Sequence, residues 1–438
     1  MSLSRRGFLA SSGFAVGALG TTSASASSAP NVLCLVADRL PGDLLGPTGV
    51  LGADLPTLRR IGASWVRFDA ASAVMVGDQP AWDGLWLGRP GSETGAMSEG
   101  QRAGRSLPDL VGWVAEHTGM DPVAAGRTGL GGRPSTASLL CDDVGNLAVL
   151  RAMQGFFRNR PPGRPWFAAV GLRGLRELDA WAAVQSADTP PVDLGLAPRD
   201  LPQPPPTLRS GAPQPQLLLE HAPAPSDWTD GHWQAALWQS ARLLESLDGV
   251  LHRLLASLDA SLHGQNTVVV LTAAQGSPLA RHGRLRPDDL SEGSVRVPLA
   301  VRWPWERAPE SIATPVSLLD LAPTLCAVLG IPGLPDARGL NLRPLLDGYP
   351  APRRTEVVTE GFVEGRSVRS REFRHTTWRD DPVARLTHLP SDPHEERNLA
   401  DNPGYSSTVD THREALRLWE AGLRLVPGAK AGWPGDLR

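Results

Sequence analysis

Three stretches of apolar residues restrict the fold of this chain more than any other feature of its sequence. They cover residues 31–37, 165–171 and 266–272, and none shows regular alternation of apolar and polar positions. A continuous apolar run of this length is typical of a strand that is buried on both faces of a parallel sheet. Segments with helical spacing lie between the runs, at 55–68 and 233–258. The sequence therefore predicts an α/β fold with a mainly parallel, doubly wound sheet.

Polar residues follow two of these runs, and they mark where a site is expected. Asp38 comes directly after the first run, and Gln275 comes three residues after the third. Open parallel sheets bind their ligands beyond the carboxyl ends of the strands. A further helix is predicted to open with a capping box at Ser106 and to end at Gly119.

The pattern of the sequence changes after Gly348. Short runs of alternating polarity predict antiparallel strands there, at 356–360, 367–378 and 384–389. We therefore expect an N-terminal α/β domain at 27–348 and a small C-terminal antiparallel α+β subdomain at 349–438, which ends in a helix at about 407–425. The proline-rich segment 188–228, taken by itself, is typical of a linker.

The first residues of the chain predict export. Arg5 and Arg6 form a twin-arginine signature, a short apolar stretch follows, and Ala24 to Ala26 offer a cleavage site. We expect residues 1–26 to be a twin-arginine signal peptide, which implies a bacterial protein that is periplasmic or secreted. A disordered N-terminus that merely contains two arginines is the alternative.

A membrane span and nucleic-acid partners are not expected. No later stretch reaches the about 20 apolar residues that a membrane-spanning helix needs. The formal net charge of −3 gives no argument for a polyanionic partner.

A motif near residue 80 resembles the signature of the sulfatase family in the alkaline phosphatase superfamily. Residues 78–82 read DQPAW and residues 85–90 read LWLGRP, beside the family's C-x-P-S-R and L-L-T-G-R-x-P. Further segments at 294–304, 318–325 and 389–400 also resemble the family, in the same order. The resemblance covers the whole mature chain, and it implies the sulfatase fold, with the proline-rich segment packed on its body.

The resemblance also implies a nucleophile that this chain does not have. In the family, the signature cysteine is oxidised to formylglycine. Here Asp78 stands at the cysteine position, Ala81 at the serine position and Trp82 at the arginine position. We expect no formylglycine. A carboxylate nucleophile at Asp78 is the alternative.

The family's metal ligands are largely replaced as well. Sulfatases hold one Ca²⁺ or Mg²⁺ with acidic and amide side chains, and hard cations need several oxygen ligands at once. Asp38 keeps one ligand position, whereas Arg39, Ala274 and Gln275 occupy others. We therefore expect no metal cofactor. Asp38 is then better explained as a capping carboxylate, and Arg39 is expected to replace the metal by pairing with both Asp38 and Asp78.

Positions that contact the sulfate group in the family are changed too. Arg127 and Gly129 stand where the family has lysine and histidine, and Arg176 stands at another histidine position. His282 is kept. Trp82 and Trp86 could form an aromatic platform for a sugar ring, but filling the space of the missing groups is the favoured interpretation.

The leading hypothesis is a degenerate sulfatase, a pseudoenzyme that acts as a binding or partner protein. Its partner would be a sulfated glycan or an active sulfatase paralogue. The alternative is a hydrolase of sulfate or phosphate esters with an altered site. A purely structural subunit is a third possibility, which a large apolar surface patch would indicate.

Overall fold

The computed structural model describes residues 29–424 apart from 99, 105, 131–136, 143–144, 186–193, 210–224, 226, 306–307, 351–353, 362–364 and 380. The expected signal peptide therefore lies outside the described residues, as do parts of the proline-rich segment. Within the described part of the chain, no helix is both long and apolar enough to cross a membrane.

The centre of the molecule is an eight-stranded, mainly parallel sheet, and the three apolar runs form its middle. β1 (Asn31–Arg39) lies between β6 (Phe167–Leu172) and β7 (Thr267–Gln275) and is parallel to both, and every residue of these strands is buried. The complete order is β5-β4-β6-β1-β7-β8-β2-β9. The remaining strands are β4 (Val123–Gly126), β5 (Ser138–Cys141), β8 (Leu299–Arg302), β2 (Val66–Phe68) and β9 (Ser311–Ile312). Only the pairings of β8, with β7 and with β2, are antiparallel within this sheet, so the predicted fold class is confirmed.

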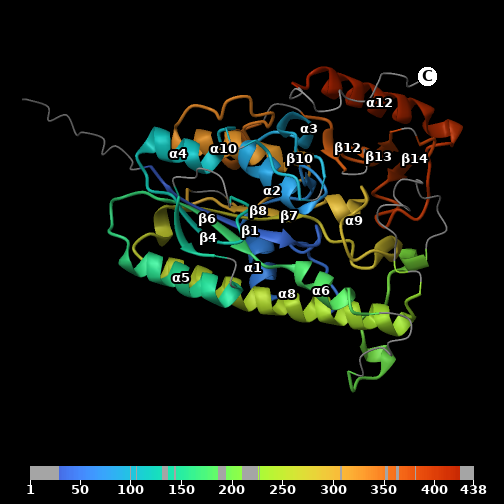
Figure 1. Ribbon diagram of the computed structural model, residues 1–438, viewed down its shortest axis with the longest axis horizontal. Helices are drawn as coiled ribbons and strands as arrows, with labels where there is room; N and C mark the ends of the chain where they lie inside the picture. The colour runs from blue at the N-terminus through green and yellow to red at the C-terminus, as the bar shows by residue number, and fades with distance from the viewer. Residues whose placement is uncertain are drawn as a thin grey trace, which may run out of the picture.

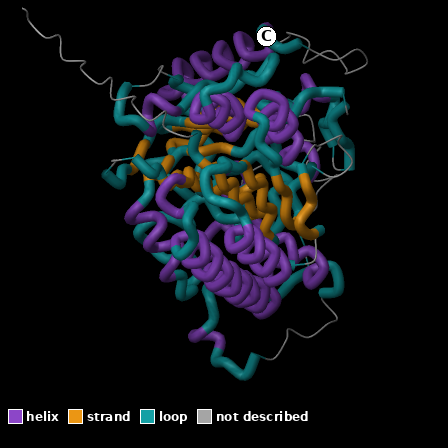
Figure 2. Tube along the Cα trace, turned by 90° about the vertical axis from the view of Figure 1, so that its left-hand side faces the viewer, coloured by secondary structure: helices purple, strands orange, loops and turns teal. Residues whose placement is uncertain are grey.

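Helices cover both faces of this sheet (Figure 1; Figure 2), as expected for a doubly wound fold. One layer consists of α1 (Pro56–Ser64), α5 (Asn146–Asn159), α6 (Leu178–Ala182) and α8 (Asp230–Asp259). The other layer contains α2 (Asp78–Leu87), α3 (Gly91–Thr94), α4 (Leu110–Thr118) and α10 (Leu321–Leu329). The long α8 begins with a capping box formed by Thr229 and His232.

Two local predictions need correction. The helix expected from Ser106 begins only at Leu110, because the Asp109 side chain accepts a hydrogen bond from the Gly112 amide and so takes the N-cap position. The proline-rich segment does not behave as a free linker where it is described. Thr207 is buried, and Gln234 of α8 donates a hydrogen bond to the Pro198 carbonyl at 3.1 Å.

The C-terminal part of the chain forms a separate antiparallel sheet, as predicted. Its strands follow one another in chain order: β11 (Val357–Glu360), β12 (Gly365–Arg369), β13 (Phe373–Trp378) and β14 (Ala384–His388). α12 (Ser406–Ala421) packs on this sheet through Leu416, which meets Val358 and Val368. A short helix of the N-terminal part, α9 (Glu292–Val295), lies beside it (Figure 1). The boundary after residue 348 stays a prediction.

Candidate functional site

Four neighbouring strands bring polar side chains to one edge of the central sheet. Arg39 is the last residue of β1 and is paired in register with Gln275, the last residue of β7. Arg127 directly follows β4, and Arg176 follows β6 by four residues. These strands are adjacent and parallel, so their carboxyl ends meet at the same edge. These residues, which were named from the sequence, therefore lie at this edge of the sheet.

Glycines allow the strand ends to come this close. Gly126 has a φ of +72°, and a Cβ atom there would lie 2.2 Å from the Gly171 carbonyl oxygen. A Cβ on Gly171 would lie 1.9 Å from the carbonyl oxygen of Arg127. Any larger residue would push β4 and β6 apart. This close contact fixes the backbone from which Arg127 projects.

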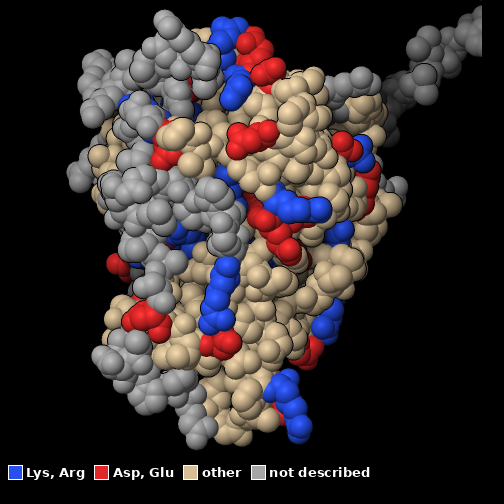
Figure 3. All heavy atoms as spheres, turned by 90° about the vertical axis from the view of Figure 1, so that its right-hand side faces the viewer, with Lys and Arg blue, Asp and Glu red and all other residues tan. Residues whose placement is uncertain are grey.

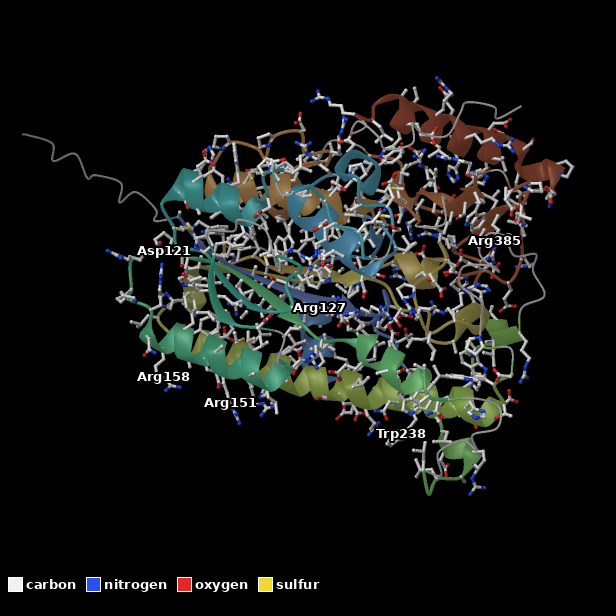
Figure 4. All side chains as sticks on the ribbon, viewed as in Figure 1. Asp121, Arg127, Arg151, Arg158, Trp238 and Arg385 are labelled. Carbon is white, nitrogen blue, oxygen red and sulfur yellow. The ribbon has the colours of Figure 1, made fainter. Side chains whose placement is uncertain are left out.

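Asp78, the first residue of α2, lies in the middle of three arginines. Its Oδ1 is 3.4 Å from Arg39 Nη2, and its Oδ2 is 2.6 Å from Arg176 Nε and 3.6 Å from Arg127 Nη2. Gln275 Nε2 also donates a hydrogen bond to Oδ1 at 3.3 Å. The Asp78 side chain is only 7% exposed. Figure 4 places Arg127 at the centre of the molecule, at the end of the sheet.

Arg39 pairs with a residue that the sequence did not suggest. Its Nη1 lies 2.7 Å from Oδ1 of Asp179 in α6, while its Nη2 reaches Asp78. The expected ion pair between the Arg39 guanidinium group and the Asp38 carboxylate is wrong. The Asp38 carboxylate accepts a hydrogen bond from the backbone amide of Arg39 instead. The guanidinium group therefore joins β1, α2 and α6.

Asp38 acts as a cap for backbone amides. Its Oδ1 accepts hydrogen bonds from the amides of Arg39 at 2.6 Å, Gly174 at 2.8 Å and Arg176 at 3.4 Å. Burial raises the pKa of Asp38 to about 7, against the opposing effect of these hydrogen bonds and of Arg39. This arrangement agrees with the capping interpretation and holds the turn after β6 against the end of β1.

We expect Asp38→Asn to gain stability relative to the wild type as pH rises. The folded chain holds a proton on Asp38 up to a pKa of about 7, whereas the unfolded chain releases it near 3.8. The protonated Asp38 therefore stabilises the folded wild type at low pH, and this stabilisation is lost as pH rises from 3.8 to above about 7. Asparagine does not titrate, and it keeps the acceptor oxygen. Urea unfolding at about pH 4 and about pH 8 should show a relative gain of about 2–4 kcal/mol. A difference that does not vary with pH would contradict the assignment.

Trp82 and Gly129 lie in direct contact. A Cβ on Gly129, whose φ is +70°, would lie 2.4 Å from the Cβ of Trp82. Trp82 is 1% exposed and Trp86 is 2% exposed, and Trp86 Nε1 donates a hydrogen bond to the Thr128 carbonyl at 2.6 Å. Neither ring presents a face to a ligand, so the sugar platform is not formed and the space-filling interpretation fits the structure.

His282 does not join this cluster. It lies in the turn η5 (Arg281–Gly283) with a φ of 54°, and the charges that act on it are those of Asp289, Arg385, Arg284 and Arg281. Burial lowers the pKa of His282 to about 4, and both ring nitrogens lack a hydrogen-bond partner among the described residues. His282 is therefore a neutral side chain that lies outside the Asp78 cluster, near the C-terminal sheet.

The residues at the sheet edge do not fit the divalent cation that the resemblance implies. Asp38 is turned toward backbone amides, and Gln275 Oε1 accepts a hydrogen bond from the Gly77 amide at 3.4 Å. Ala274 has no ligand atom, and the guanidinium group of Arg39 brings a positive charge. Within the described ranges, no three His, Cys, Asp or Glu side chains are placed to hold a metal ion together.

Comparison with known sequences gives the same family as the motifs. The family model "Sulfatase" matches residues 211–331. The chain is 29% identical over 199 residues to a Delta 4,5-hexuronate-2-O-sulfatase of Bacteroides thetaiotaomicron, which covers 42% of this chain and 40% of that protein. It is 31% identical over 167 residues to a choline-sulfatase of Rhizobium meliloti, with coverage of 36% and 31%. The chain thus matches no more than 40% of the length of either relative.

Solved structures extend the similarity to the fold of almost the whole chain. A 2-O GAG sulfatase superposes with a TM-score of 0.78 at 20% identity, covering 92% of this chain and 97% of the other. A phosphonate monoester hydrolase of Agrobacterium radiobacter gives 0.74 at 19% identity, with coverage of 90% and 95%. The chain therefore has the fold of these hydrolases, and its residues 211–331 are similar to the sulfatase family.

Proposed function

We propose that this chain is a catalytically silent, sulfatase-like protein that binds a sulfated glycan without hydrolysing it. The observation that carries the proposal is the position of Asp78 among Arg39, Arg127 and Arg176. Asp78 stands where the resemblance places the family's nucleophile, and there it serves as the counter-ion of three guanidinium groups.

The charges around Asp78 oppose a covalent role for it. A carboxylate nucleophile has to direct a lone pair at the substrate. Here both oxygens face cations, and Oδ1 also accepts a hydrogen bond from Gln275. Esterification would remove the negative charge of Asp78 and leave the three guanidinium groups with one carboxylate fewer. Such a step becomes costly because uncompensated charge at a mostly buried site is unfavourable.

The names of the relatives supply the ligand class of this proposal. They include the hexuronate-2-O-sulfatase and an N-acetylglucosamine-6-O-sulfatase, both of Bacteroides thetaiotaomicron. We therefore propose a sulfated glycan as ligand and an active sulfatase paralogue as a possible protein partner. Export by the twin-arginine route to the periplasm or beyond belongs to the same proposal.

A hydrolase with an altered site is the second candidate. It is favoured by the relatives, which are named as sulfatases, and by the fold, which this chain shares with a phosphonate monoester hydrolase. In that case Asp78 would act as the nucleophile and would have to leave its arginine partners during each turnover.

Activity and metal measurements on the purified protein decide between the two candidates. We expect p-nitrophenyl sulfate and p-nitrophenyl phosphate to be turned over no faster by the wild type than by Asp78→Asn. Intact-mass analysis should give an unmodified Asp78, and elemental analysis should give no stoichiometric Ca²⁺ or Mg²⁺. Turnover that is lost in Asp78→Asn, with or without bound metal, would reject the silent protein in favour of the hydrolase.

A further inference from the structure

A cleft opens between the N-terminal part of the chain and the C-terminal antiparallel sheet. Its volume is about 440 Å³, a size that accommodates one or two sugar rings. We call it the arginine cleft. It is lined by Gly42, Asp43, Asp69, Arg281, Glu292, Arg296, Arg369, Arg371, Leu389, Pro390, Pro393 and His394. Because Gly42 and Asp43 follow β1 closely, the cleft starts near the same edge of the sheet as the Asp78 cluster.

Guanidinium groups outnumber the carboxylates in and behind this cleft. Glu292 alone is shared by Arg369 at 3.2 Å, by Arg374 at 3.0 Å and by Arg296 at 4.0 Å. The other two lining carboxylates face arginines of their own: Asp43 is 3.4 Å from Arg281, and Asp69 is 2.6 Å from Arg67. No lining carboxylate is therefore left without a cation, and the surplus charge is positive.

Two polar groups of the cleft have no partner among the described residues. Arg371 is exposed in the turn between β12 and β13 and makes no ion pair there. The Nδ1 atom of His394 is shielded from solvent and makes no hydrogen bond. A guanidinium group binds carboxylate or sulfate through a fork of donors, and a buried ring nitrogen gains from any polar partner. Arg371 is therefore accessible to a ligand.

One part of the cleft lining, which we call the proline wall, is apolar. Leu389, Pro390 and Pro393 lie in the segment that follows β14, next to His394. A sugar ring has apolar C–H faces and charged or polar edges, which suit a site with an apolar wall and a few placed polar groups. Figure 3 shows that basic and acidic side chains lie intermixed on this side of the molecule. Recognition therefore depends on the local site and not on a broad basic surface.

From this arrangement we infer that the arginine cleft binds a mono- or disaccharide unit that carries a sulfate or carboxylate group. The sugar ring lies against the proline wall, and its anionic group pairs with Arg371. The inference deepens the proposed function, on which it rests for the ligand class, and it gives the glycan a site apart from Asp78.

Calorimetric titration with D-glucosamine-2-N,6-O-disulfate tests this site on the full-length mature protein. The wild type should bind the disulfate, and unsulfated glucosamine should bind at least about tenfold more weakly. Arg371→Ala should weaken binding of the disulfate by about tenfold or more. Its matched control is Arg151→Ala, since Arg151 is equally exposed but lies on α5 in the helix layer below the sheet (Figure 4). The control should bind as the wild type does.

The possible failures are distinguishable. If Asp78→Asn changes binding of the disulfate and Arg371→Ala does not, the ligand lies at the Asp78 cluster and the arginine cleft is the wrong site, although glycan binding stands. If the wild type does not bind the disulfate, the inference is overturned, while the lack of turnover still supports a silent protein. Hydrolysis of the disulfate would instead overturn the proposed function.

Discussion

Glu292→Gln should lower the free energy of unfolding by about 3–5 kcal/mol, one of the two largest effects that we expect for a single substitution. The Glu292 carboxylate is buried and is the shared partner of Arg369 in β12 and Arg374 in β13. Burial alone would raise the pKa of Glu292, but Arg369, Arg374 and Arg296 together hold it well below its usual range. Glutamine keeps the shape of the side chain and leaves these guanidinium groups without their carboxylate.

Urea unfolding near pH 7 measures this effect. Glu414→Gln is the matched control, because Glu414 pairs with Arg417 on the exposed face of α12 and such pairs contribute little. We expect its unfolding midpoint to stay close to that of the wild type. If Glu292→Gln unfolds at the same midpoint as this control, the ionic connection between α9 and the C-terminal sheet is not important for stability.

Arg39→Ala should destabilise the protein by a similar amount, about 3–5 kcal/mol. The Arg39 side chain is 3% exposed, and its removal leaves Asp179 without its 2.7 Å partner and Asp78 with only the more exposed Arg127 and Arg176. The second substitution that relieves this loss should be Asp179→Asn, because the Arg39 guanidinium group pairs with the Asp179 carboxylate and not with that of Asp38.

The same urea experiment separates this effect from a general loss of arginine. Arg59→Ala removes an exposed guanidinium group that pairs with Asp54 at 2.8 Å, and it should change stability by less than about 1 kcal/mol. A wild-type midpoint for Arg39→Ala would mean that the buried ion pairs do not hold β1, α2 and α6 together. Equal stability of Arg39→Ala with and without Asp179→Asn would mean that the two side chains are not coupled.

The sequence predicted the parts of the fold whose residues are apolar throughout. β1, β6 and β7 were evident because strands buried on both faces are dominated by continuous apolar runs. β4 was not evident, since its four residues are Val-Ala-Ala-Gly and small residues give no clear pattern. The start of α4 was placed too early because both Ser106 and Asp109 are good capping residues, and only the folded chain shows that Asp109 is used.

The strand ends predicted where the site would lie, and the family pattern assigned most of its residues. Asp38, Arg39, Asp78, Arg127, Arg176 and Gln275 were all named from aligned motifs, and the structure brings them together. Asp179 was missed because its ion pair with Arg39 depends on the turn between β6 and α6, and no local sequence pattern predicts the shape of that turn. Of the named residues, His282 lies elsewhere, since the loop after β7 carries it toward Asp289.

The arginines around Asp78 also determine what a substitution at this position would require. Replacing Asp78 by cysteine would introduce the residue of the sulfatase motif, but it would remove the carboxylate that Arg39, Arg127 and Arg176 share. Three guanidinium groups at a mostly buried site would then lack their common counter-ion, which is unfavourable. A cysteine at position 78 would therefore need accompanying changes at the arginines, so position 78 cannot be altered independently of its neighbours.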